Sequence, residues 1–345
     1  MSYKIPRSKT LLPIDIDAVA ALIARTQKKN GEIPWSDQLK TDPWDHVEAA
    51  MGLAIGGYYH AARRAFDWMA ENQLESGCWF SAYKKGIPID RTRDANLSSY
   101  IAVGVYHHYL ITGEGAFLSR MWPTVRAAID FALSLQAPGG EIYWAVSPEG
   151  KIDPMALLTG SSSIFMSVKC ALMIAKHLRV HMPGWLKALD RLQHAIAHKP
   201  ELFNMTKARF AMDWFYPVLA GAVKGAAARE RINQFWKKFV INGQGVRCVS
   251  DQSWITLAET SELSLALAGM GNHALAEIVF NWICDKRYDD GSYWCGYTYP
   301  DMIIWPEEKI SWTNAVVLMA ADALYNLTPA AGLFSHRFWE TTAIG

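Results

Sequence analysis

The sequence predicts an all-α fold in which about twelve helices form a closed double-walled ring, six helices inside and six outside. Three observations support this prediction: helical segments that alternate in character, a short template that recurs along the chain, and connections that are long in one direction and short in the other. At 345 residues and 51% apolar side chains, the chain is large enough to bury such a core. We therefore expect residues 1–345 to form a single domain.

The helical segments alternate between two types of surface. Amphipathic segments with charged faces are expected in the outer wall, at 15–28, 58–73, 116–136, 184–197, 226–241 and 272–287. Segments that are apolar nearly all round are expected in the inner wall, at 45–55, 94–112, 161–178, 212–224, 254–269 and 311–327. A helix without a polar face has to be surrounded by protein, which predicts two concentric layers.

The recurring template is a Gln, a Gly four residues later and a Trp soon after. It reads QKKNGEIPW at 27–35, QLESGCW at 73–79 and QAPGGEIYW at 136–144, and RYDDGSYW at 287–294 lacks the Gln. Repetition at intervals of tens of residues indicates an architecture assembled from copies of one supersecondary unit.

The connections differ in length according to their direction. Those from an outer helix to the next inner helix are long and rich in Trp, Gly and charge, at 30–44, 76–93, 137–160, 198–211, 242–253 and 288–310. The reverse connections are short turns such as Gly56-Gly57. In a closed ring, the long loops all fall at one end and surround the mouth of a central cavity, which we expect to be the functional end.

Composition narrows the possible partners. The net charge of +1 comes without a basic block, so nucleic acid is not expected as a partner. Five cysteines without a CxxC pair favour free thiols. No signal-peptide core and no spanning segment is visible in the sequence, which predicts a cytoplasmic protein. The oligomeric state is left open.

The template resembles the Gln…Gly…Trp repeats of the α/α toroids of terpenoid cyclases, including the squalene-hopene type, and of protein prenyltransferases. The chain also looks like bacterial proteins labelled prenyltransferase, which share TGSSS (159–163), MDWFYP (212–217), VSDQSW (249–254), AET (258–260) and WPEEKISWT (305–313). The resemblance implies an (α/α)6 toroid that covers most of the chain. It also implies that the template Gln and Trp residues brace the outer helices.

Two family features are missing from this chain. The acidic DxDD motif of the cyclases has no counterpart, since Asp15 and Asp17 in IDID lie at the start of the first outer helix. Where zinc-dependent prenyltransferases carry a metal-binding Cys, this chain has Ser292. We therefore expect no metal and no cofactor.

Carboxylates occur at the start of every expected inner helix. Glu259 and Glu262 lie inside an apolar helix and share one face, so they should face a wet cavity or pair with Arg91, Arg93 or Arg247. The candidate catalytic residues are Glu259, Glu262, Asp213, Asp251 and Glu307. The candidate binding residues are Trp44, Asp45, Arg91, Arg93, Asp94, Asp153, Ser161, Trp214, Tyr216, Arg247, Trp254, Trp305 and Trp312.

Several of these residues have a simpler structural explanation. Asp94 and Ser161 could serve as helix N-caps, and the Glu259/Glu262 pair could belong to an Arg–Glu network. Acid–indole pairs such as Asp251 with Trp254 suit a carbocation or a sugar ring equally well.

Three functions remain open. The resemblance favours an enzyme that cyclises or transfers an isoprenoid small molecule in the central cavity, by acid–base or carbocation chemistry. The alternative is a carbohydrate-active enzyme, because six-hairpin glycosidases form the same ring and 110–136 looks like their sequences; two carboxylates would then flank a glycosidic bond. The third is a toroid that binds a ligand without catalysis.

Overall fold

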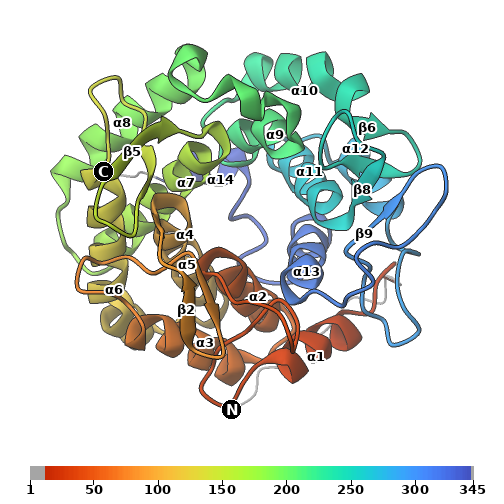
Figure 1. The fold of residues 1–345 in the computed structure, drawn as a ribbon, viewed down its shortest axis with the longest axis horizontal. Helices are drawn as coiled ribbons and strands as arrows, with labels where there is room; N and C mark the ends of the chain where they lie inside the picture. Colours follow the sequence, from red (N-terminus) through yellow and green to blue (C-terminus); the bar gives the residue numbers. More distant parts are fainter. Residues whose placement is uncertain (1–11, 343–345) are drawn as a thin grey trace.

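The computed structural model describes residues 12–342 and shows a closed ring of helices in two walls (Figure 1). The outer helices are α1 (Ile16–Thr26), α3 (Tyr59–Glu71), α6 (Gly115–Ser134), α8 (Pro183–His198), α10 (Gly225–Phe239) and α12 (His273–Asn281). The inner helices are α2 (Pro43–Ile55), α4 (Ala95–Ser99) with α5 (Ile101–Thr112), α7 (Leu158–His177), α9 (Ala211–Leu219), α11 (Leu257–Gly269) and α13 (Ser311–Tyr325). Packing of α13 against both α1 and α2 closes the ring.

Burial follows the predicted alternation of helix types. Every residue of α11 is buried, whereas α12 buries only Ala276, Val279 and Phe280. The helical ring predicted from the sequence is thus confirmed. That all of residues 1–345 belong to one domain stays a prediction, and the expected absence of a signal peptide concerns residues 1–11, which lie outside the described part.

The template joins each outer helix to the next one. The side-chain amide of Gln27 donates to the carbonyls of Gly31 and Ala61, and Gln73 donates in the same way to Gly77 and Thr124. Gln136 repeats the arrangement with Gly140 and Ala188. The bracing role expected for these glutamines is confirmed.

The template glycines are needed because the loop touches the backbone of the neighbouring outer helix. Gly77 has a φ of +87°, and a Cβ there would lie 2.3 Å from the carbonyl oxygen of Ala127. In the fourth copy, a Cβ on Gly291 would lie 2.9 Å from that of Ala18 in α1. The last copy therefore contacts the first outer helix, where the ring closes.

The expectation of an all-α protein is wrong, because three small antiparallel sheets form within the long connections. β1 (Ala82–Lys84) pairs with β2 (Ile87–Asp90); β3 (Arg93–Asp94), β4 (Tyr143–Val146) and β5 (Ile152–Ala156) form a second sheet. The third contains β6 (Val240–Ile241), β7 (Gly245–Arg247), β8 (Trp254–Thr256) and β9 (Gly296–Thr298). Two short 3₁₀ turns, η1 (Pro200–Leu202) and η2 (Met205–Arg209), complete the connections.

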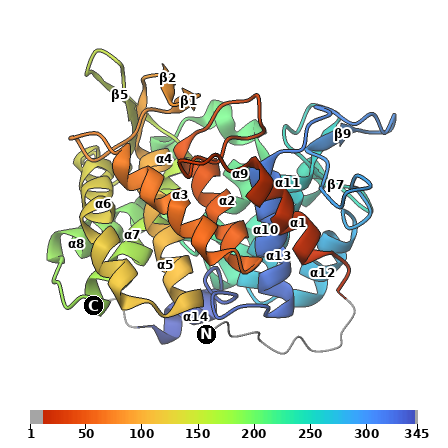
Figure 2. The same cartoon turned by 90° about the horizontal axis from the view of Figure 1, so that it is seen from below.

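The two ends of the ring differ, as Figure 2 shows. Hairpins β1–β2 and β4–β5 and the loop at β9 project from one end, and short turns occupy the other. The pairing of Asp94 in β3 with Ala145 in β4 links two loops that are about 50 residues apart in sequence. The long connections thus form a structured rim around one opening.

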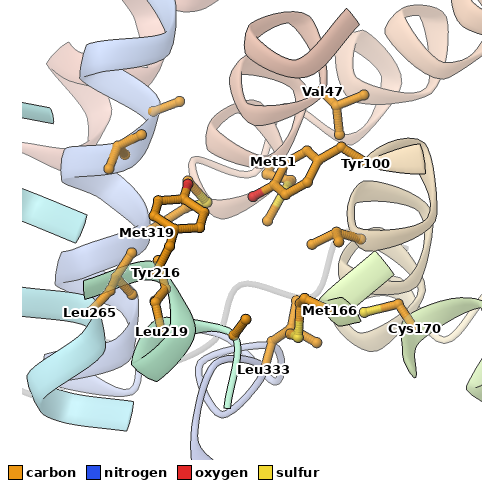
Figure 3. Packing of buried hydrophobic residues seen from close by; sticks show 14 of the residues in the cluster. Val47, Met51, Tyr100, Met166, Cys170, Tyr216, Leu219, Leu265, Met319 and Leu333 are labelled. Atoms are coloured by element: carbon orange, nitrogen blue, oxygen red, sulfur yellow. The ribbon is translucent and has the colours of Figure 1, made fainter. Parts of the chain in front are cut away.

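The opposite end of the ring is closed. Apolar side chains from different inner helices, including Met51, Met166, Leu265 and Met319, surround the axis together with two tyrosines (Figure 3). A C-terminal segment ending in α14 (His336–Thr341) covers this end. Its Trp339 lies under the buried ammonium of Lys169, 4.2 Å from the ring centre.

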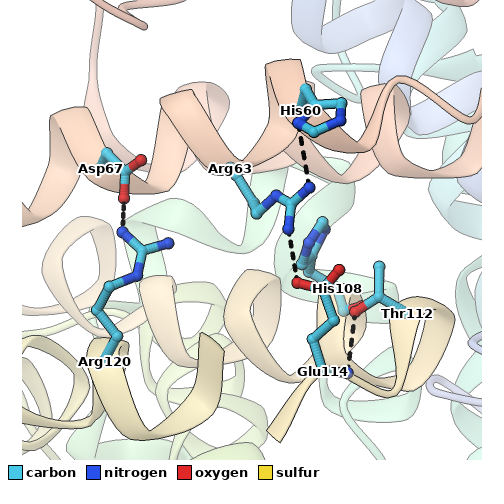
Figure 4. Close-up of polar contacts among 7 residues, drawn as sticks. All are labelled: His60, Arg63, Asp67, His108, Thr112, Glu114 and Arg120. Carbon is cyan, nitrogen blue, oxygen red and sulfur yellow. Dashed lines mark hydrogen bonds and ion pairs between the residues drawn. The ribbon is translucent and has the colours of Figure 1, made fainter. Parts of the chain in front are cut away.

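The outer wall also carries polar contacts between neighbouring helices. Arg63 of α3 donates to Glu114 at 2.7 Å, and Arg120 of α6 pairs with Asp67 (Figure 4). His108 lies beneath them, packed on the Phe117 ring. This histidine is fully buried, and within residues 12–342 neither of its ring nitrogens has a hydrogen-bond partner.

Among the helices of residues 12–342, α7 alone is long and apolar enough to cross a membrane by length and composition. Of its most apolar window, 83% is buried inside the ring, as expected for a core helix.

Candidate functional site

A cavity of about 410 Å³ opens at the loop-bearing end of the ring. Its lining is strongly acidic and includes three indole rings, those of Trp44, Trp144 and Trp312. The acidic lining residues come from α2, α11 and the rim: Asp42, Asp45, Glu48, Asp90, Asp94, Glu259 and Glu262. This combination of carboxylates and indoles suits a ligand that carries many hydroxyl groups.

Helix α2 places two acids one turn apart. It begins at Pro43 after the N-cap Asp42, whose carboxylate accepts from the backbone N–H of Asp45 and from the indole N–H of Trp35 at 2.8 Å. Burial raises the pKa of Asp45 well above its usual range, and the charges of Asp42 and Glu48 raise it further. Asp45 therefore binds a proton more tightly than an exposed aspartate does.

Glu48 lies one turn deeper on the same helix. Its Oε1 accepts from the indole N–H of Trp44 at 2.9 Å and from the hydroxyl of Tyr100 at 3.3 Å. Burial raises the pKa of Glu48 to about 8, although these two donors act in the opposite direction.

Helix α11 repeats the pattern. Glu262, one turn below Glu259, accepts from the Tyr216 hydroxyl at 2.6 Å. Burial and the charges of Glu48 and Glu259 raise the pKa of Glu262 well above its usual range. Glu259 contacts the thiol of Cys248, whose pKa is raised by burial and then by this carboxylate.

The four acids form two levels. Because α2 and α11 both begin at the mouth, Asp45 and Glu259 lie one turn nearer the opening than Glu48 and Glu262. The helices flank α13, so the two acidic faces meet across one cavity. The deeper acids are held by tyrosine hydroxyls, and the upper ones are nearer to an incoming ligand.

Two indoles in the lining have free donors. The Nε1 atoms of Trp144 and Trp312 are buried and lack a hydrogen-bond partner among the described residues 12–342. A buried N–H without an acceptor costs free energy, which a ligand hydroxyl would recover.

Some expected site residues cap helices at the cavity wall. Asp94 is the N-cap of α4 and accepts from the backbone N–H groups of Asn96 and Leu97, while burial raises its pKa to about 6. Asp213 accepts from the backbone and hydroxyl of Thr159 at the start of α7. Ser161 is buried inside α7 and does not serve as its cap, which is Leu157, and its hydroxyl has no partner in the part of the chain that the structure describes.

Other expected residues lie outside the cavity. Trp214 packs between α9 and α10, and its indole N–H donates to the carbonyl of Arg231. Asp251 forms an exposed ion pair with Arg209 at 2.7 Å, and Glu307 is exposed in the rim. Trp254 donates to the backbone of the exposed Trp305.

The expected arginine partners of Glu259 and Glu262 do not reach them. Arg93 donates to the carbonyl of Ser147, and Arg91 lies 5.9 Å from the Phe80 ring. Arg247 in β7 and Asp153 in β5 are half-buried in the sheets of the rim. Within residues 12–342 neither glutamate forms an ion pair, so burial raises the pKa of Glu262 without a cation to oppose it.

The candidate catalytic and binding residues did not include Asp42, Glu48, Tyr100 or Trp144, although Asp42 and Glu48 are among the carboxylates at the start of the first expected inner helix. Glu48 was detectable, because it follows Asp45 by three residues in an apolar helix, the same spacing as Glu259 and Glu262. Trp144 was assigned to the bracing template, yet it lines the cavity. Within residues 12–342 no group of three His, Cys, Asp or Glu side chains could hold a metal ion.

Comparison with known sequences finds a relative that is a mannosidase. The chain is 47% identical over 324 residues to the MMP endo-(1,4)-3-O-methyl-α-D-mannosidase of Mycolicibacterium hassiacum, covering 94% of this chain and 90% of that one. No protein-family model matches the chain.

Solved structures share the fold at low sequence identity. A glycosidase in complex with glucose has a TM-score of 0.70 at 15% identity, over 91% of this chain and 96% of that one. The GH63 mannosylglycerate hydrolase of Thermus thermophilus, in complex with glucose, has a TM-score of 0.69 at 10% sequence identity. The match covers 88% of this chain and 99% of that one. A D-mannose isomerase has a TM-score of 0.69 at 12% sequence identity, and the match covers 93% of this chain and 98% of that one.

These findings correct the interpretation drawn from the repeats. The resemblance to terpenoid cyclases and prenyltransferases, and the isoprenoid chemistry that it implied, are wrong, because the relative at 47% identity is a mannosidase. The expectations of an enzyme and of a small-molecule ligand are supported, and the carbohydrate alternative replaces the main interpretation. The cytoplasmic location stays a prediction.

Proposed function

Because the chain belongs to the family of the MMP endo-(1,4)-3-O-methyl-α-D-mannosidase, we propose that it is a glycoside hydrolase that cleaves within chains of α-1,4-linked mannose units. One observation carries the proposal: Asp45 and Glu259 face the same cavity near its mouth from two different helices. Hydrolysis of a glycosidic bond requires a pair of carboxyl groups placed on either side of the bond.

Asp45 is proposed as the general acid. A glycosidic oxygen leaves more readily when it is protonated, so the acid has to hold its proton near neutral pH. Burial and the neighbouring charges of Asp42 and Glu48 raise the pKa of Asp45 in that direction. The indole N–H of Trp35 and the ammonium of Lys40, 3.9 Å away, hold Asp42 as the acceptor beside it.

Glu259 is proposed as the second carboxylate, which assists attack at the anomeric carbon from the other side of the bond. Glu48 and Glu262 act as positioning residues, because tyrosine hydroxyls at 3.3 Å and 2.6 Å already hold them below the reacting pair. The free indole N–H groups of Trp144 and Trp312 are available for sugar hydroxyls. Their ring faces can stack on the apolar face of a pyranose.

Conservative substitutions of the two acids test the proposal. Asp45→Asn and Glu259→Gln should each lower kcat/KM on an α-1,4-linked 3-O-methylmannose oligosaccharide by about 10³-fold, with the melting temperature retained. The matched control is Asp251→Asn, which removes a rim carboxylate that is 63% exposed and should leave the rate unchanged. Activity of both acid variants within a factor of about 3 of the original would exclude these roles.

A further inference from the structure

Exposed apolar side chains gather at the loop-bearing end of the ring. Among the described residues 12–342, ten large apolar side chains are exposed, and eight of them lie in the long connections of the rim. The two others are Tyr58, just before α3, and Ile278 in α12. Single exposed apolar residues are common on protein surfaces, but this concentration at one end indicates an interaction surface.

The two sides of the opening differ in charge. Hairpins β1–β2 and β4–β5 lie on one side and the loop after β9 on the other (Figure 1). That loop, residues 299–309, contains three acids and one lysine. The hairpins expose two acids, Asp90 and Glu149, and a larger number of cations: Lys84, Lys85, Arg91 and Lys151. The hairpin side is therefore both apolar and cationic.

The tip of the β1–β2 hairpin is tightly built. Lys84 pairs with Ile87, which leaves Lys85 and Gly86 as a two-residue turn with φ values of +53° and +74°. Ile87 and Ile89 alternate along β2 and so share one face, and they are 66% and 56% exposed. The hairpin thus presents two isoleucines next to two lysines.

The β4–β5 hairpin repeats this combination. Its turn is closed by the backbone N–H of Ser147, which donates to the carbonyl of Lys151 at 2.8 Å. The guanidinium of Arg93 in β3 also donates to the carbonyl of Ser147, at 2.6 Å. Ile152 follows the exposed Lys151 and is itself 51% exposed. Both tips are held by their own hydrogen bonds and present these side chains without rearrangement.

A flat, anionic partner fits the two hairpins. They project from the rim as separate tips (Figure 2), and none of Ile87, Ile89 and Ile152 lines the acidic cavity. Isoleucine gains free energy by entering the interfacial region of a bilayer, and lysine is attracted by anionic headgroups at the same surface. A stable protein–protein interface instead has a continuous buried core.

We propose that hairpins β1–β2 and β4–β5 dock the protein on an anionic lipid surface. Ile87, Ile89 and Ile152 enter the headgroup region, and Lys84 and Lys85 contact lipid phosphates. Because both hairpins lie on one side of the opening, this contact leaves the acidic side free for a ligand. The proposal concerns where the protein is held and does not depend on the reaction in its cavity.

Sedimentation with lipid vesicles tests the proposal. We expect vesicles of phosphatidylcholine with about 30% phosphatidylglycerol to bind the protein about 10-fold or more tightly than vesicles of phosphatidylcholine alone. Binding should weaken as salt is added, because salt screens the attraction between lysines and headgroups. Lys84→Gln combined with Lys85→Gln should weaken binding to the anionic vesicles about 10-fold. Ile87→Ser combined with Ile89→Ser should weaken it by about 10-fold or more.

The outer wall supplies matched controls. Ile278→Ser removes an isoleucine that is 52% exposed, and Lys187→Gln combined with Lys237→Gln removes two exposed lysines of α8 and α10. These variants should bind the anionic vesicles as the unmodified protein does. All the substituted side chains are exposed, so every variant should keep its melting temperature.

Absence of vesicle binding, equal binding to both kinds of vesicle, or unchanged binding by the isoleucine variant would overturn the proposal. Unchanged vesicle binding together with loss of a dimer seen by light scattering would assign the isoleucines to a protein interface instead. Unchanged vesicle binding with a raised KM for the oligosaccharide would assign them to the substrate path. Vesicle binding by a protein that does not cleave the oligosaccharide would contradict the proposed hydrolase and leave the docking surface standing.

Discussion

The outer wall and the cavity of this ring differ in how their polar groups are satisfied. In the wall, three template glutamines each donate to two backbone carbonyls, and neighbouring helices form ion pairs. In the cavity, acids are buried next to one another and two indole N–H groups have no partner. The repeated glutamine contacts therefore mark the scaffold, and buried acids beside unpaired indole N–H groups mark the cavity, although His108 is an unpaired group outside it.

The comparison is tested most severely at a template glycine. Gly77→Ala should lower the free energy of unfolding by about 4 kcal/mol or more, because the residue has a positive φ and its Cβ would collide with the Ala127 carbonyl. Urea unfolding measures the change.

Gly86→Ala is the control for this substitution. Gly86 has a similar φ of +74° but no atom within 4 Å of its Cβ, so only the backbone cost of about 1 kcal/mol should remain. If both variants lose the same free energy of unfolding, the close contact between the loop and the helix at Gly77 does not affect stability.

In the cavity, the acids should make stability depend on pH in the opposite sense to an ion-paired carboxylate. Burial raises the pKa of Glu48 from 4.5 to about 8, so the folded protein binds this proton more tightly than the unfolded chain. The stabilisation from this proton is complete at and below pH 4.5, the value for the unfolded chain, and is progressively lost as the pH rises to about 8. Between pH 5 and pH 8 this loss amounts to about 3 kcal/mol.

Glu48→Gln isolates this contribution, since the amide oxygen still accepts from Trp44 and Tyr100. We expect urea unfolding of the variant to depend much less on pH over the same range. If its pH dependence matches that of the unmodified protein, the ionisation of Glu48 does not govern the stability of the cavity.

A smaller effect is expected at a template glutamine. Gln136→Ala removes donors to Gly140 at 3.0 Å and to Ala188 at 2.9 Å and should cost about 2 kcal/mol of unfolding free energy. Its kcat/KM on the oligosaccharide should stay unchanged. A loss of activity at full stability would contradict the separation of wall and cavity.

The walls were predictable from the sequence because burial imposes a pattern on it. A helix such as α11, buried on all sides, has to be apolar all round, and α12 has to keep a charged face. The same reasoning singled out Glu259 and Glu262, since a carboxylate inside an apolar helix needs either water from a cavity or a cationic partner.

The structure of the rim and the chemistry of the site were harder to predict from the sequence. Strands of two to five residues such as β3 and β4 form only when distant loops meet, and no local pattern specifies that pairing. The Gln-Gly-Trp template was misleading about the chemistry. It holds neighbouring helical hairpins together, and a helical ring needs such contacts whatever reaction it catalyses. Trp144 belongs to that template and to the cavity at once, and spacing alone does not separate these roles.

The closed end of the ring has a consequence for how a polymer is handled. Only about 10 Å³ of free space remains among Glu48, Tyr100, Tyr216, Glu262 and the C-terminal segment, which is scarcely one water molecule. A polysaccharide therefore cannot pass through the ring, and both product fragments have to leave through the opening by which the substrate entered. We expect one cut per encounter, and the sizes of the earliest products would reveal it: fragments of many lengths, rather than a ladder released stepwise from one end.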